Sequence, residues 1–192
     1  RKLTKNKHFP VLIDEEGSNV TRLSKIISHN ISANFFGNLY EINRIFCFKI
    51  LKHYIFSLSK FLTELGININ TIPVLDVLRN RTSKVIGNRS FSKNKKIVKD
   101  LGNFTIKNLH LNKVAAVIKH IPGHGAAKTD SHKSMPKVLL QPKKLKQIDF
   151  YPFKLSKAKL AMTAHILYTK IDKNSVATHS NKIIKNIIRK KL

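Results

Sequence analysis

The chain has 192 residues, of which 37 are lysine or arginine and 10 are acidic, giving a net charge of +27. Its hydrophobic fraction of 42% is ordinary for a globular domain and too high for a disordered chain. The single cysteine, Cys47, excludes an intrachain disulfide. The longest apolar stretch, residues 45–58, is interrupted by Lys49, Lys52 and His53, so the sequence predicts no membrane partner.

The excess of positive charge has two interpretations. A basic surface can bind nucleic acid by releasing counterions from phosphates. However, lysine is scattered along the whole chain, and basic clusters such as Arg189–Lys191 are short. The sequence contains no helix-turn-helix pattern, no zinc-ligand spacing and no aromatic–basic RNA motif. We therefore favour a general compositional bias without a specific nucleic-acid partner, and keep a basic nucleic-acid-binding module as the alternative.

Apolar runs and helical patterns alternate from the N-terminus. Residues 10–13 form a short apolar run that ends at Asp14, which predicts a buried strand. Apolar residues spaced three and four apart over 39–65 predict one long amphipathic helix. The apolar run 71–77, with Asp76 near its end, predicts a second strand.

The same alternation continues to the C-terminus. The remaining predicted elements are a helix near 97–104, a strand at 114–118, a polar loop at 122–136, a strand within 160–168 and a helix over 183–188 capped by Ser180. Continuous apolar strands that alternate with helices predict the α/β class, with a parallel sheet buried on both faces. The pattern is compatible with an open doubly wound sheet and with a (β/α)8 barrel, although four strands are too few to close a barrel.

Polar residues follow several of these strands. Asp14, Asp76, Lys119, His120 and His165 fall at predicted carboxyl ends, where α/β folds place their chemistry. Residues 119–132 are the most specific segment: Lys-His-Ile-Pro-Gly-His-Gly, a short spacer, and then Asp-Ser-His. A carboxylate beside an imidazole can fix its tautomer and raise its basicity, which suits general acid–base chemistry. A single histidine in such a loop is more often a packing or capping residue, but the whole string is hard to explain in that way.

This string resembles the signature of family 3 glycoside hydrolases of the bacterial β-N-acetylglucosaminidase type, with Ile121 where phenylalanine is usual. Further matches follow in the order of that family: residues 13–23, 73–77, 85–91 and 161–165. The resemblance therefore covers essentially the whole chain. It implies that residues 1–192 form part of one catalytic domain, an incomplete (β/α)8 TIM-type barrel that lacks its first strand and its C-terminal strands.

The resemblance also implies an activity. A retaining β-N-acetylhexosaminidase would hydrolyse terminal β-linked N-acetylglucosamine in the cytoplasm, with a muropeptide or a chitooligosaccharide as its carbohydrate partner. No cofactor and no metal is implied. The implied general acid/base is His132, with Asp130 as its partner. The implied sugar-binding residues are Asp14, Arg22, Arg89, Lys119 and His120. We also expect Asp76 and His165 to line or support the pocket.

Two departures from the family pattern affect these expectations. Ser18-Asn19 stands where the family has Gly-Arg, next to Asp14 and Arg22. The aspartate nucleophile is expected after the 183–188 helix, on a strand that would follow Leu192. We therefore expect the 192 residues alone to be inactive, and an incomplete barrel leaves strand edges and part of its core exposed. Turnover of a chromogenic β-N-acetylglucosaminide that is lost in His132→Ala would contradict this expectation.

Two relatives of this activity are further alternatives. One is a catalytically dead relic of the same fold that binds the sugar without cleaving it. The other is a family 3 β-glucosidase. The segment from Gly-His-Gly to Asp-Ser-His argues against the second, because it belongs to the N-acetylglucosaminidase branch. The oligomeric state does not follow from the sequence.

Overall fold

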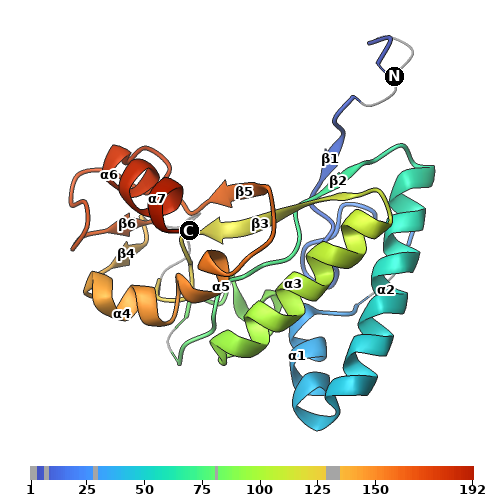
Figure 1. Cartoon of the computed structure of the whole chain (residues 1–192), viewed down its shortest axis with the longest axis horizontal. Helices are drawn as coiled ribbons and strands as arrows, with labels where there is room; N and C mark the ends of the chain where they lie inside the picture. Colours follow the sequence, from blue (N-terminus) through green and yellow to red (C-terminus); the bar gives the residue numbers. More distant parts are fainter. Residues whose placement is uncertain (1–3, 7–8, 28–29, 81, 129–134) are drawn as a thin grey trace.

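A parallel sheet forms the centre of the molecule. The computed structural model describes residues 4–6, 9–27, 30–80, 82–128 and 135–192. Its main sheet has the order β1-β2-β3-β5, and every neighbouring pair is parallel (Figure 1). The four strands are β1 (Leu12–Ile13), β2 (Ile69–Asn70), β3 (Ala115–Ile121) and β5 (Leu160–Thr163). The predicted α/β class with a parallel sheet is therefore confirmed, and four strands leave it open, as an incomplete barrel requires.

The predicted strand at 71–77 is shifted. The regular strand β2 ends at Asn70, and within 71–77 only Val74 forms an isolated parallel bridge, to Lys119. Pro73 explains the difference, because proline has no backbone N–H to contribute to a ladder. The run nevertheless stays beside β3, since the Leu75 N–H donates to the Lys119 carbonyl at 2.8 Å.

The predicted helix over 39–65 is in fact two helices. They are α1 (Ala33–Ile42) and α2 (Arg44–Glu64), and Asn43 separates them in an extended conformation with φ −150°. The Asn43 side chain accepts a hydrogen bond from the Phe46 N–H at 3.0 Å, so it caps the start of α2. An asparagine within an apolar helical pattern thus acts as a helix boundary.

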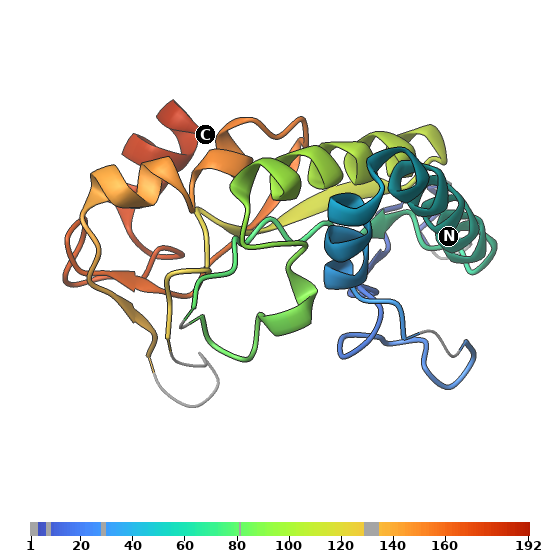
Figure 2. The same ribbon diagram turned by 90° about the horizontal axis from the view of Figure 1, so that it is seen from below.

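Helices α1, α2 and α3 (Lys95–Leu111) form one layer beside the sheet. Figure 2 shows α3 running along β3, while segments 15–27 and 82–90 lie below the sheet in this view. The main core lies between the helices and the sheet and includes Leu51, Leu101 and Leu109, all of which are fully buried. The polar residues at the carboxyl ends of β1 and β3 lie outside this core and line an open cavity.

The C-terminal part builds a second, smaller core. Its parallel pair is β4 (Lys137–Val138) with β6 (Leu167–Tyr168). Its helical segments are α4 (Pro142–Gln147), α5 (Tyr151–Lys154), α6 (Asn181–Ile183), a π-helical turn (Ile184–Ile188) and α7 (Arg189–Lys191). The predicted C-terminal helix is confirmed, and Ser180 caps it by accepting from the Ile183 N–H at 3.2 Å. Across the described ranges, no helix combines the length and apolar character that a membrane crossing needs.

Candidate active site

The five residues predicted to bind sugar line one open cavity of about 580 Å³ at the carboxyl ends of the strands. They are Asp14 after β1, Arg22 in the following loop, Arg89 in the 3-10 turn Gly87–Arg89, and Lys119 and His120 on β3. His165, which follows β5, lines the same cavity. The predicted acid/base pair, Asp130 and His132, lies outside the described residues.

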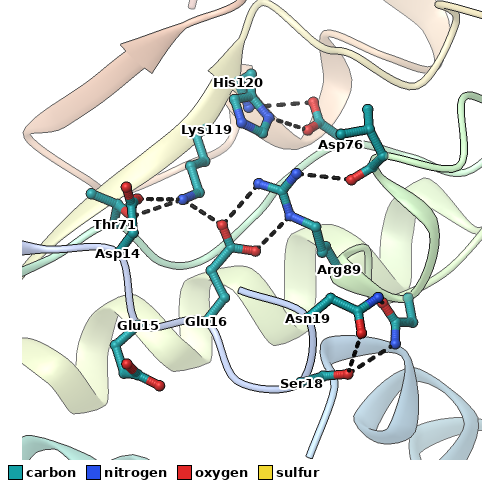
Figure 3. A network of polar contacts seen from close by, with 12 residues as sticks. Asp14, Glu15, Glu16, Ser18, Asn19, Thr71, Asp76, Arg89, Lys119 and His120 are labelled. Atoms are coloured by element: carbon teal, nitrogen blue, oxygen red, sulfur yellow. Dashed lines mark hydrogen bonds and ion pairs between the residues drawn. The ribbon is translucent and has the colours of Figure 1, made fainter. Parts of the chain in front are cut away.

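Lys119 is the cation at the floor of this cavity. Its side chain is only 2% exposed, and its ammonium group has three oxygen partners. The Nζ atom lies 2.9 Å from Asp14 Oδ1, 2.7 Å from Thr71 Oγ1 and 2.5 Å from Glu16 Oε1 (Figure 3). Since an ammonium group has one donor for each of these acceptors, the network holds Lys119 in a single position.

Asp14 is the acceptor that faces the open space. The Thr71 hydroxyl and the Lys119 ammonium both donate to its Oδ1. Burial favours the neutral acid, but these two hydrogen bonds outweigh it and hold the pKa of Asp14 below its usual range. Asp14 Oδ2 makes no hydrogen bond to any residue that the structure describes, and the side chain is 33% exposed. An ionised carboxylate oxygen is therefore available to accept from a ligand hydroxyl.

Arg89 is held by a two-point ion pair. Its Nε and Nη2 atoms each lie 2.8 Å from one oxygen of Glu16, and its Nη1 donates to the Val85 carbonyl at 2.8 Å. A forked pair of this kind fixes the plane of the guanidinium as well as its position. The remaining N–H bonds of Arg89 are thus presented to the cavity in a set direction.

A buried carboxylate, that of Glu15, holds the loop after β1 through hydrogen bonds. Glu15 is fully buried, and its Oε2 accepts from the backbone N–H groups of Arg22 at 2.8 Å and Leu23 at 3.1 Å. The loop turns at Gly17 and Ser18, whose φ angles are 86° and 51°. A positive φ is uncommon for serine and is adopted more easily by glycine, which the family pattern has at this position. Its hydroxyl is 3.1 Å from Asn88 Nδ2, which ties the turn to the neighbouring segment.

His120 is oriented by Asp76, which is fully buried behind it. Asp76 Oδ2 lies 2.7 Å from His120 Nδ1, and Oδ1 accepts from the backbone N–H groups of His120 at 3.3 Å and His124 at 2.6 Å. Burial favours the neutral acid, but the neighbouring His120 outweighs it and keeps the pKa of Asp76 below its usual range. A carboxylate at Nδ1 fixes the proton on that nitrogen and leaves Nε2 for the cavity. Asp76 therefore supports the pocket rather than lining it.

His124 is a second buried imidazole beside this pair. Its side chain is 4% exposed, its ring centroid is 5.7 Å from that of His120, and its Nδ1 has no partner among the described residues. Burial lowers the pKa of His124, and the attraction of Asp76 only partly opposes this. The neutral form is thus the one that the folded site accommodates.

We expect the buried His124 to make the fold sensitive to acid. Because its pKa is lower in the folded chain than the unfolded value of about 6.5, its stabilising contribution is present above pH 6.5 and is lost as the pH falls. His124→Gln should reduce the stability difference between pH 7 and pH 5, by at most about 2 kcal/mol. Urea unfolding at both pH values measures this. The exposed His110→Gln is the control, and an equal effect of the two variants would contradict the assignment.

Three residues of this network escape prediction from the sequence. Glu16 and Thr71 hold the cations, and His124 packs against His120. Glu16 stands in an acidic run, but the run does not reveal which carboxylate meets which cation. In the described parts of the chain, no group of three or more histidine, cysteine, aspartate or glutamate side chains is arranged to hold a metal ion.

Comparisons with known proteins show which family this chain resembles. Residues 7–192 match the family described as glycosyl hydrolase family 3 N terminal domain. A β-hexosaminidase A of Pseudoalteromonas piscicida is 33% identical over 95% of the chain, and a β-hexosaminidase of Thioalkalivibrio sulfidiphilus is 32% identical over 84%. The crystal structure of native NagZ from Neisseria gonorrhoeae superimposes with a TM-score of 0.88 at 28% identity, covering 94% of the chain.

These similarities concern part of each longer protein. The chain spans 33% and 47% of the two curated relatives, and 53% of the N. gonorrhoeae structure. A second N. gonorrhoeae NagZ structure, with the same TM-score of 0.88, is a complex with N-trifluoroacetyl-D-glucosamine. Since the family match extends over nearly all of its residues, the chain belongs to glycoside hydrolase family 3, in the N-terminal domain of that family.

Proposed function

We propose that the protein hydrolyses terminal β-linked N-acetylglucosamine and that the cavity around Asp14 holds that sugar. The relatives named β-hexosaminidase and the solved complex with an N-acylated glucosamine support this substrate class. The finer proposal is a cytoplasmic enzyme that acts on a muropeptide or a chitooligosaccharide, with the carbohydrate as its only specific partner.

The chemistry of the cavity suits a neutral sugar with several hydroxyl groups. Its two inner carboxylates, Asp14 and Glu16, balance the two inner cations, Arg89 and Lys119. Arg22 and Lys84 also line the cavity, so its lining as a whole is basic. The inner ion pairs offer strong charge-assisted hydrogen bonds to hydroxyl groups. The observation that carries the proposal is this convergence of ionised acceptors and donors on one cavity.

Each predicted binding residue has a distinct part in this proposal. Asp14 accepts through Oδ2, while Arg89 donates through the N–H bonds that Glu16 and Val85 leave unused. His120 contributes Nε2, because Asp76 occupies Nδ1. Arg22 is exposed at the rim of the cavity. The Lys119 ammonium group already has three partners, so a ligand hydroxyl that reaches it has to replace one of them.

The proposed reaction is retaining hydrolysis. His132, with Asp130 as its partner, first protonates the departing glycosidic oxygen as a carboxylate nucleophile attacks the anomeric carbon. It then removes a proton from the water that releases the sugar. We assign sugar binding and acid–base chemistry to these 192 residues.

Titration with N-acetylglucosamine tests the binding part of the proposal. The chain should bind this sugar, and Asp14→Asn should weaken binding by at least about tenfold, because the variant loses the ionised acceptor. Glu64→Gln, which removes an exposed carboxylate at the end of α2, is the control and should bind normally. Equal affinity of the wild type and Asp14→Asn would show that the sugar binds elsewhere.

A further inference from the structure

Glu16 stands at the centre of the cavity network without being one of the expected sugar ligands. Its side chain is 4% exposed. Its Oε1 is shared by Lys119 Nζ at 2.5 Å and Arg89 Nη2 at 2.8 Å, and its Oε2 accepts from Arg89 Nε at 2.8 Å. Both oxygens are therefore engaged by protein cations, which leaves Glu16 little capacity to contact a ligand directly.

The two cations that Glu16 joins come from distant parts of the chain. Lys119 lies on β3, whereas Arg89 ends the short 3-10 turn Gly87–Arg89. Arg89 Nη2 and Lys119 Nζ bind the same Glu16 oxygen, Oε1, so the two charges lie close together in a poorly solvated place. Like charges at such a distance repel strongly. The shared carboxylate offsets this repulsion because it attracts both cations.

The position of Glu16 is itself fixed by its loop. Its N–H donates to the Val20 carbonyl at 2.9 Å, and the next residue, Gly17, turns the chain with a φ of 86°. Glu15, on the opposite side of the backbone, is anchored to the N–H groups at 22 and 23. The carboxylate of Glu16 is thus presented from a loop whose backbone is held by its own hydrogen bonds.

We propose that Glu16 is a positioning residue for the sugar site. It aims the unused N–H bonds of Arg89 at the ligand and holds the Lys119 ammonium against Asp14. The inference rests on the proposed function, since it assigns Glu16 a role in binding that sugar. It predicts that the loss of Glu16 weakens specific hydrogen bonds to hydroxyl groups, rather than the fold as a whole.

The test compares Glu16→Gln with the wild type and with Glu64→Gln. N-acetylglucosamine should bind Glu16→Gln at least about tenfold more weakly, while Glu64→Gln binds normally. The 3-, 4- and 6-deoxy analogues of the sugar separate positioning from general damage. For the wild type, at least one analogue should have a lower affinity than the parent sugar. For Glu16→Gln, the same analogue and the parent sugar should have equal affinities, because the variant no longer directs a donor to that hydroxyl.

The outcomes are distinguishable. A wild type that does not bind N-acetylglucosamine overturns both the proposed function and this inference. A wild type that binds, together with a Glu16→Gln variant that binds equally well or loses the same factor for the parent and every analogue, overturns the inference alone. If circular dichroism shows that Glu16→Gln is unfolded, Glu16→Asp is used in its place. That variant keeps the charge but is one methylene too short to bridge both cations, and the same pattern across the analogues is expected.

Discussion

A Gly125→Ala variant is expected to lose about 3 kcal/mol or more of unfolding free energy, at the upper end of the usual cost of overpacking. A Cβ atom at position 125 would lie 1.8 Å from the Val77 carbonyl oxygen and 3.3 Å from Asp149 Oδ1. The nearest obstacle is backbone, which cannot rotate away as a side chain can. The turn would have to shift, and it carries the buried His124 that packs against His120.

Urea unfolding monitored by circular dichroism measures this loss. Gly66→Ala is the matched control, because Gly66 has a φ of 79° but nothing within 4 Å of the added Cβ. The control should lose only about 1 kcal/mol, which is the conformational cost of a left-handed alanine. A Gly125→Ala variant no less stable than Gly66→Ala would mean that the two segments are not in contact.

An Asp76→Ala variant is expected to lose about 3–5 kcal/mol at pH 7, because it removes the carboxylate that compensates His120 and two backbone N–H groups in a buried place. The pH dependence follows from the lowered pKa of Asp76. Its contribution is complete above the unfolded pKa of about 3.9 and is lost as the pH falls through the lower folded value. The stabilities of the wild type and the variant should therefore converge in acid.

Denaturant unfolding between pH 3 and pH 7 tests this expectation. Glu41→Gln, which removes an exposed carboxylate from α1, controls for the change in net charge and should be nearly neutral. Asp76→Asn separates charge from shape, because its amide would donate to His120 Nδ1 and move the ring proton to Nε2. A difference between the wild type and Asp76→Ala that is constant with pH would contradict an ionised Asp76 in the folded chain.

The sequence predicts the layer arrangement well because the spacing of apolar residues indicates which faces of the helices and strands are buried. The helix near 97–104 lies within the longer α3, and the run at 114–118 overlaps β3, which begins one residue later. The errors arise at single residues. Asn43 divides one apolar pattern into two helices, and Pro73 breaks the ladder beside β3. In each case a local hydrogen-bonding preference overrides a pattern defined by hydrophobicity.

From the strand pattern alone, the site is predictable only where a residue follows a strand, whereas Arg22 and Arg89 are expected only through the family resemblance. Asp14 and His120 lie at strand ends, so the fold class alone suggests that they meet. Glu15 and Glu16 directly follow Asp14, yet the three carboxylates diverge: one faces the cavity, one anchors backbone N–H groups, and one joins two cations. The divergence depends on the turn at Gly17, and no period in the sequence encodes it.

We propose that the cavity lined by Asp14, Arg89 and His120 holds N-acetylglucosamine. A crystal structure of the chain grown with saturating N-acetylglucosamine tests it most directly. We expect sugar density in the cavity, with one hydroxyl on Asp14 Oδ2 and another on the free N–H bonds of Arg89. Sugar density elsewhere, such as the groove lined by Phe48 and Phe104 on the helical face, with the Asp14 cavity left unoccupied, would contradict it.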